Sequence, residues 1–236
     1  MAKRMNSCNE TNRAAIQGVT KPRFGEVKIR ERGRLPHWER EGGTYFVTFR
    51  LADALPRTVL AKMVERQRVL EAAKRSGLKL LPAQEVLLAE YSPGRIEQYL
   101  DSGNGACRLR DPRIAELVAN ALRFWDGQRY RLMAWCLMPN HVHVVFRLLP
   151  GQGLANLLRS WKSYTARMAN RILGRTGDFW QREYYDRLIR DGHELERAIQ
   201  YVTSNPERAG LTGWCWVWCA GVDAPTTVGL ETSATR

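Results

Sequence analysis

The sequence predicts an α+β domain in which an antiparallel sheet has helices packed on one face. Three observations favour this fold class: a β-rich alternating stretch near residue 45, a tight Pro-Asn turn between two further apolar stretches, and amphipathic helical patterns between the strand candidates. The 236 residues, 44% of them hydrophobic, are sufficient for one substantial core.

The first strand is expected over residues 43–51, GTYFVTFRL, because its side chains alternate and it is rich in β-formers. The alternation places four side chains on one face: Tyr45, Val47, Phe49 and Leu51. Residues 56–77 then turn helical and charged, and a second helix is expected over residues 111–125, where Asp-Pro forms a start signal.

Two strands are expected on either side of the Pro139-Asn140 turn, over residues 130–138 and 141–148. They are followed by an amphipathic helix over residues 153–173 and a short strand, EYYDRLIRD. A final helix, HELERAIQYVTS, is expected to end at the breaker Asn205-Pro206.

The ends of the chain are polar and aperiodic, which predicts a basic flexible tail over residues 1–33 and a second flexible tail over residues 221–236. The domain is therefore expected over residues 34–220, with a helical insertion at about residues 56–111.

The charge balance favours a polyanionic partner. Lys and Arg number 37 against 24 Asp and Glu, which gives a formal net charge of +13 and a pI near 10.0. No stretch has the length and apolarity of a signal peptide or a membrane span, so we expect a cytoplasmic protein without a membrane partner. Its five cysteines show no CxxC spacing and are interpreted as reduced thiols.

The stretch MPNHVHVVF, residues 138–146, contains two of the four histidines. Successive side chains of a strand point to opposite faces, so His141 and His143 share one face and the apolar residues that alternate with them share the other. Two imidazoles side by side can hold one metal ion. A histidine in a strand can also be an ordinary hydrogen-bonded residue, but the preceding turn, the apolar opposite face and the lack of carboxylate pairs or cysteine clusters nearby in sequence favour a metal site.

The final helix offers a nucleophile and a third metal ligand. Tyr201 and Asn205 are spaced i and i+4, so they share one edge of the helix. Alternatives remain for both residues, since tyrosines commonly line cores and an asparagine before proline is an ordinary helix terminator. Tyr164 is interpreted as a packing residue, and neither Tyr184 nor Tyr185 has a ligand-type residue at i+4.

Three separated motifs, WCLMPNHVHVVF, FWQREYYDRLIRD and IQYVTSNPERAGL, resemble in order and spacing the REP-associated tyrosine transposases, a branch of the HUH single-strand transposases of insertion sequences. The resemblance extends from about Pro36 to Leu211 and is strongest after Leu109. It implies a ferredoxin-like HUH nuclease domain. It also implies that His141, His143 and Asn205 bind the metal and that Tyr201 is catalytic.

The resemblance further implies a metal-dependent endonuclease and strand transferase for single-stranded DNA, active in DNA transposition and recombination through a 5′-phosphotyrosine intermediate. The metal would be Mg²⁺ or Mn²⁺, because neutral imidazoles and an amide oxygen suit a labile divalent ion. The partner would be single-stranded or hairpin DNA from hairpin-forming repeats. The protein would be a nucleoid-associated bacterial protein, monomeric or homodimeric.

Basic residues on two segments are candidates for binding the DNA backbone, although such a basic face can equally be a solvated surface. They are Arg159, Lys162, Arg167, Arg171, Arg182, Arg187 and Arg190. Two other functions stay open: a DNA-binding protein of the same fold that does not cleave, and a zinc hydrolase that activates water and forms no protein–DNA adduct. The sequence near the histidines shows no acidic general base for the second.

Overall fold

The structure is a computed structural model that describes residues 28–31, 36–77 and 79–221. Its elements in chain order are β1 (Lys28–Glu31), β2 (Pro36–Glu39), β3 (Thr44–Arg50), α2 (Arg57–Ser76), α3 (Pro82–Glu90), α4 (Pro93–Asp101), η1 (Arg108–Arg110), α5 (Pro112–Arg123), β4 (Tyr130–Leu137), β5 (His141–Leu148), α6 (Leu154–Ile172), β6 (Tyr185–Ile189), α7 (Gly192–Arg208) and β7 (Val217–Cys219). Most of both predicted tails lies outside the described residues, but strand β1 falls within the segment expected to be flexible. No described helix is long and apolar enough to cross a membrane.

Five strands form one antiparallel sheet in the order β6-β3-β5-β4-β7. When the helices inserted between β3 and α5 are left aside, four of these strands and two helices follow one another as β3-α5-β4-β5-α6-β6. This is the split βαβ arrangement of ferredoxin-like domains. The hairpin predicted at Pro139-Asn140 is confirmed, and the Met138 amide donates to the His141 carbonyl oxygen across it at 2.8 Å. The predicted α+β fold class with an antiparallel sheet is confirmed.

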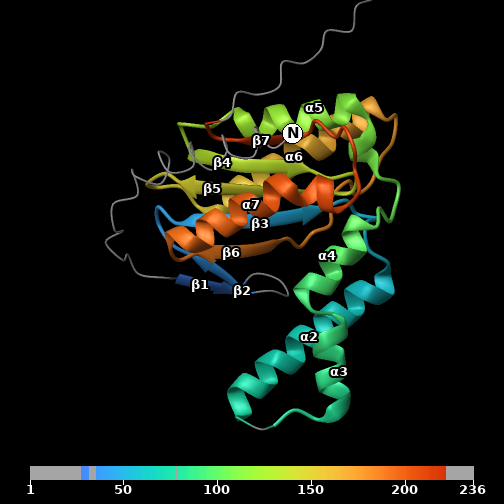
Figure 1. Cartoon of the computed structure of the whole chain (residues 1–236), viewed down its shortest axis with the longest axis vertical. Coiled ribbons are helices and arrows are strands. Elements are labelled where there is room, and N and C mark those ends of the chain that lie inside the picture. Colours follow the sequence, from blue (N-terminus) through green and yellow to red (C-terminus); the bar gives the residue numbers. More distant parts are fainter. Residues whose placement is uncertain (1–27, 32–35, 78, 222–236) are drawn as a thin grey trace, which may run out of the picture.

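The helices cover both faces of the sheet, which corrects the prediction that they pack on one face. α5 and α6 enclose a core on the face that carries Val47 and Val144, whereas α7 encloses a second core with Cys136 and Val145 (Figure 1). α7 packs there because its own apolar stripe must be buried, and this stripe consists of Leu195, Ile199 and Val202. His141 and His143 lie on the face of the sheet that α7 covers, so their side chains are enclosed between the sheet and the helices on that face.

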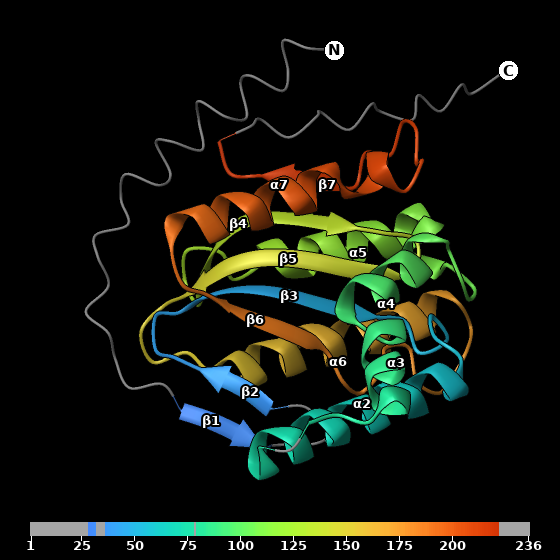
Figure 2. The same ribbon diagram turned by 60° about the horizontal axis from the view of Figure 1, so that its bottom comes forward.

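Between β3 and α5 lie three α-helices and the short 3-10 helix η1, of which α2 corresponds to the helical pattern expected over residues 56–77. α2 and α3 extend away from the sheet, and no residue of α3 is buried (Figures 1 and 2). α4 instead returns to the domain, where it buries Ile96 and Leu100 beside the ends of β3 and β5. The helix thereby brings its neighbouring polar residues to the histidine strand.

α7 continues through Pro206 to Arg208, so the predicted helix end at Asn205-Pro206 is wrong. The proline ring removes one backbone donor, but the helix is held beyond it by the Ala209 amide, which donates to the Asn205 carbonyl oxygen at 3.0 Å. Asn205 and Pro206 are both buried, so packing offsets the missing hydrogen bond. Tyr201 and Asn205 are consequently one turn apart on a continuous helix. After it, the short strand β7 pairs with β4.

Candidate active site

The two histidines begin β5 and are fully buried. In the antiparallel register, His141 is opposite Arg50 and His143 is opposite Thr48, so all four side chains share one face of the sheet. The His141 and His143 Nε2 atoms are 2.9 Å apart. The predicted pairing of the two imidazoles on one face is therefore observed in the structure.

Asn140 fixes the orientation of the first imidazole. Its amide nitrogen donates to the Leu100 and Asn104 carbonyl oxygens at 3.0 and 2.8 Å, which leaves its Oδ1 facing the His141 Nδ1 at 2.7 Å. Nδ1 of His141 must then carry the hydrogen, and Nε2 presents its lone pair. Burial, followed by the neighbouring His143, lowers the pKa of His141 well below its usual value, which keeps the ring neutral.

Helix α4 supplies a carboxylate pair that the sequence interpretation missed. The Glu97 Oε1 lies 2.8 Å from His143 Nε2, and the Asp101 Oδ1 lies 3.8 Å from His141 Nε2. Burial opposes the charged form of Glu97, but His143 and His141 hold its pKa at about 2. Burial and the charge of Glu97 raise the pKa of Asp101 to about 6. Glu97 is thus the ionised partner of the histidines.

The arrangement fits a divalent metal ion. Two imidazole nitrogens 2.9 Å apart, each able to present a lone pair, repel one another unless a proton or a cation lies between them. Glu97, His141 and His143 each offer one ligand atom, and these atoms lie within 4.8 Å of one another. Imidazole nitrogens and a carboxylate oxygen together suit several divalent first-row metals and Mg²⁺.

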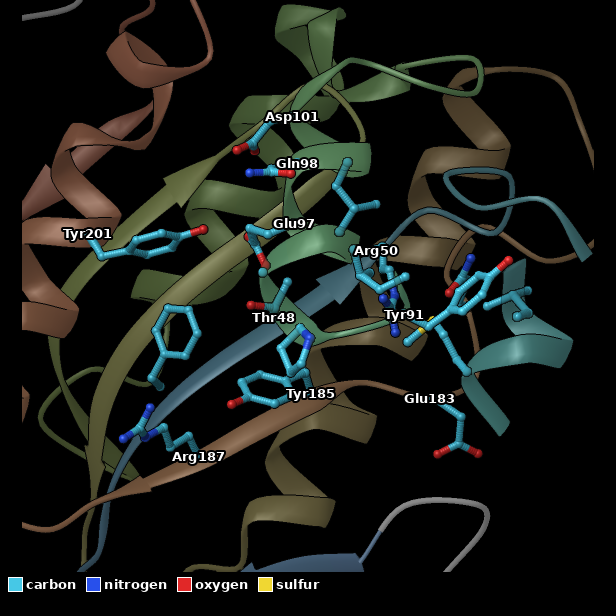
Figure 3. Close-up of a pocket in the computed structure, with 18 of the residues that line it drawn as sticks. Thr48, Arg50, Tyr91, Glu97, Gln98, Asp101, Glu183, Tyr185, Arg187 and Tyr201 are labelled. Carbon is cyan, nitrogen blue, oxygen red and sulfur yellow. The ribbon is translucent and has the colours of Figure 1, made fainter. Parts of the chain in front are cut away.

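The Tyr201 side chain extends from α7 to the centre formed by the histidines and the carboxylates of α4. Its ring centroid lies 5.4 Å from that of His143, and its hydroxyl points toward Glu97 and Asp101 of α4 (Figure 3). Burial, followed by the charge of Glu97, raises the pKa of Tyr201, so its hydroxyl is protonated in the metal-free protein. Asn205 is fully buried one turn along, and neither atom of its amide has a hydrogen-bond partner in the part of the chain that the structure describes.

A cavity of about 1070 Å³ lies over this centre, between α4, α2, α7 and the segment that leads into β6. Glu97, Asp101 and Tyr201 line it (Figure 3). Six arginines also line it: Arg50, Arg66, Arg182, Arg187, Arg197 and Arg208. The cavity is therefore lined by six cationic side chains, beside a pair of carboxylates that adjoin the buried imidazoles.

The seven basic residues predicted to bind DNA divide into two groups. Arg182 and Arg187 line the cavity, but Arg187 and Arg190 also pair with the carboxylate of Glu194. The other four belong to α6, which covers the opposite face of the sheet: Arg159, Lys162, Arg167 and Arg171. The apolar stripe of α6 packs against the core on the face opposite the histidines, and DNA binding by these four residues stays a prediction.

Lys162 also contacts the backbone that precedes β6, while its binding of DNA stays a prediction. Its ammonium donates to the Gln181 and Arg182 carbonyl oxygens at 2.6 and 2.7 Å, and burial lowers its pKa to about 8. The side chain thus crosses the sheet edge and holds the backbone that precedes β6 at the wall of the cavity.

Substituting Asn140 with alanine should weaken both the fold and the metal centre. The change removes the hydrogen bonds from Asn140 to the Leu100 and Asn104 carbonyl oxygens and leaves the His141 Nδ1–H without its acceptor, which costs about 3 kcal/mol of unfolding free energy. Freed rotation of the imidazole should lower Mn²⁺ affinity about 10- to 100-fold. Denaturant unfolding and calorimetric titration measure the two effects.

Asn104→Ala is the matched control for Asn140→Ala, because the Asn104 side chain donates to Tyr99 and Ser102 in the same region but does not touch an imidazole. It should leave Mn²⁺ affinity unchanged. Equal losses of affinity in the two variants would contradict the orienting role of Asn140.

Part of the sequence is similar to known transposases. Residues 111–205 match the family model for IS200-like transposases. A REP-associated tyrosine transposase of Haemophilus influenzae is 26% identical over 94 residues, which cover 34% of this chain and 52% of the relative. The chain thus spans about half the length of the curated relative that it matches.

Two solved structures are similar at low identity. One is a REP-associated tyrosine transposase bound to a REP hairpin, with 17% identity, coverage of 80% of both chains and a TM-score of 0.42. The other is a protein assigned as a transposase from Deinococcus radiodurans, with 14% identity, coverage of 79% of this chain and 98% of the other, and a TM-score of 0.29.

The family-model match ends at Asn205 and contains both histidines and Tyr201, whereas Glu97 and Asp101 lie outside it. The resemblance drawn from the three motifs is therefore confirmed for this part of the chain: residues 111–205 carry the pattern of the IS200-like transposases, and a segment of the chain is similar to a REP-associated tyrosine transposase.

Proposed function

We propose that this protein is a metal-dependent single-stranded DNA endonuclease and strand transferase that acts through a 5′-phosphotyrosine intermediate. The observation that carries this proposal is the meeting of three elements at one cavity: the imidazole pair of β5, the carboxylates of α4 and the Tyr201 hydroxyl of α7. These groups match the needs of a covalent phosphodiester transfer, namely a metal, a proton acceptor and a nucleophile.

His141, His143 and Glu97 would hold the metal, with Asn205 as a further proposed ligand. The bound Mg²⁺ or Mn²⁺ would polarise the phosphodiester and stabilise the negative charge that develops on its oxygens. The amide of Asn205 is suited to this role because it is buried and has no other partner within the described residues. Asn140 and Thr48 would orient the imidazoles through their Nδ1 atoms.

Tyr201 would attack the phosphorus atom. As its oxygen bonds to phosphorus, the phenolic proton passes to a carboxylate of α4, and the bond from phosphorus to the 3′ oxygen of the preceding nucleotide breaks. That oxygen takes up a proton and leaves as a free 3′-hydroxyl, while the 5′-phosphate stays on Tyr201. A 3′-hydroxyl can later attack the same linkage and rejoin the strand, so no nucleotide cofactor is required.

The proposed partner is single-stranded DNA next to hairpin-forming repeats. The name of the curated relative, a REP-associated transposase, supports such repeats, and the arginines that line the cavity suit a polyanionic strand. The net charge of +13 agrees with this partner.

A covalent adduct assay tests the proposal. The purified protein is incubated with end-labelled single-stranded hairpin DNA from the flanks of its gene, with Mg²⁺, Mn²⁺ or EDTA, and resolved on a denaturing gel. We expect a labelled protein band that requires metal and disappears after proteinase treatment. Tight binding without an adduct or a nick, on several substrates and with both metals, would favour a DNA-binding protein that does not cleave.

One observation favours a second candidate, a metal-dependent hydrolase. Glu97 and Asp101 provide the acidic groups near the histidines that the sequence alone did not reveal, and a centre of two histidines and a glutamate is typical of zinc hydrolases. A hydrolase would release nicked DNA without any protein-linked label, so the same gel separates the two functions.

A further inference from the structure

A row of three side chains crosses the sheet next to the metal centre. Arg50 of β3 is opposite His141 of β5 on one side. On its other side, Leu51 bridges to Trp180 in antiparallel fashion, and the Gln181 amide donates to the Arg50 carbonyl oxygen at 2.8 Å. Antiparallel partners share a face, so His141, Arg50 and Gln181 follow one another at the strand spacing of about 4.8 Å.

The Arg50 side chain is buried without a close counter-ion. It is 4% exposed and lines the cavity, and its Nε has no hydrogen-bond partner in the described part of the chain. Glu97 and Glu183 act on the guanidinium only through longer-range charge. A buried guanidinium that lacks a partner is costly, and it matches a phosphate oxygen in charge and geometry.

Gln181, next to Arg50, has a backbone that hydrogen bonds hold in place and a side-chain amide without hydrogen-bond partners among the described residues. Its backbone is held on both sides, since its amide bonds to Arg50 and its carbonyl accepts from Lys162. Its side chain is 8% exposed and lines the cavity, yet neither its Nε2 nor its Oε1 has a hydrogen-bond partner among the described residues. A glutamine side-chain amide that is fixed in position, with an unpaired donor and an unpaired acceptor, can form two hydrogen bonds to the edge of a base.

We propose that Arg50 and Gln181 form a nucleotide-binding subsite beside the metal centre. Arg50 binds a backbone phosphate of a single strand, and Gln181 hydrogen-bonds the base of the adjoining nucleotide through both atoms of its amide. This inference rests on the proposed function, in that the substrate is single-stranded DNA. The subsite would set which nucleotide adjoins the phosphodiester presented to Tyr201, and adenine is the expected base because its N6 and N7 pair with a glutamine amide.

The test uses three methionine variants of the full chain: Gln181→Met, Arg50→Met and Arg131→Met. Methionine keeps an unbranched side chain of similar length without donors, and Arg131 is an exposed arginine of β4 that does not line the cavity. Binding is measured in EDTA to single-stranded oligonucleotides that carry a fixed hairpin with randomised flanking nucleotides. The bound fraction is sequenced, and affinity is followed against salt concentration.

We expect the parent to show a base preference at one flanking position, and Gln181→Met to reduce that preference by at least about fivefold. Arg50→Met should lower affinity and reduce the salt slope by about 0.7, as expected for one lost contact to a single-strand phosphate. Arg131→Met should change neither property. Because each cavity variant removes an unpartnered buried group, thermal melting of Gln181→Met and Arg50→Met should occur no lower than in the parent.

The outcomes separate this subsite from the proposed function. If the parent forms the metal-dependent adduct but Gln181→Met keeps the base preference and Arg50→Met keeps the salt slope, the subsite is wrong and the cleavage function stands. If the two variants lose these properties but the parent forms no adduct, the subsite stands and the cleavage function fails.

Discussion

Replacing Tyr201 with phenylalanine is expected to abolish the covalent protein–DNA adduct completely while leaving the fold and metal affinity intact. The phenyl ring keeps its edge-to-face contacts with Phe46 and His143, at centroid distances of 5.8 and 5.4 Å, and its place under Arg208. Only the buried hydroxyl is lost, together with its interaction with the Glu97 carboxylate, which keeps its contact with His143. The denaturing gel, together with thermal melting and Mn²⁺ titration, measures all three properties.

Tyr185→Phe is the matched control for Tyr201→Phe. Tyr185 lines the same cavity and also packs against Phe46, and burial raises the pKa of its hydroxyl as well. It belongs to β6 rather than to α7 and should retain adduct formation. If the adduct still forms with Tyr201→Phe but is lost with Tyr185→Phe, then Tyr185 rather than Tyr201 is the nucleophile.

Local signals made much of the fold predictable from sequence. The Asp-Pro start signal is realised at α5, where the Asp111 side chain accepts the Arg113 amide at 3.0 Å. The histidine hairpin was predictable because strand alternation and turn chemistry depend only on neighbours along the chain. The i and i+4 spacing likewise placed Tyr201 and Asn205 on one helical edge, once the helix is known to continue through Pro206.

Non-local features were not predictable in the same way. Alternation in β5 does not decide which helix covers which face, since Val145 and the histidines are buried on one face as fully as Val144 is on the other. The sequence therefore made the basic residues of α6 candidates for binding DNA without showing that this helix lies across the sheet from the histidines. Glu97 lies far from the histidines in sequence, and its contact depends on how α4 folds back. A signal existed, because Glu97 and Asp101 are spaced i and i+4 beside two apolar residues of a short helix.

The substitution Glu97→Gln is expected to lower the affinity for Mn²⁺ by about 100-fold, because it removes the ionised ligand oxygen but keeps the shape of the side chain. Bound metal stabilises the native state by mass action, so the rise in melting temperature that Mn²⁺ gives the parent should largely disappear in this variant. Glu183→Gln is the matched control, since Glu183 lines the same cavity without contacting an imidazole. It should retain the full rise.

Asn205→Leu distinguishes the contribution of the amide from that of the carboxylate. In the absence of metal, leucine of similar volume removes two unpartnered buried polar atoms and should not lower the melting temperature. With Mn²⁺, loss of a ligand oxygen should reduce affinity about tenfold, less than for Glu97→Gln because the amide carries no charge. A variant that melts lower without metal but binds Mn²⁺ like the parent would show that Asn205 only packs α7, and that Glu97 alone completes the imidazole pair.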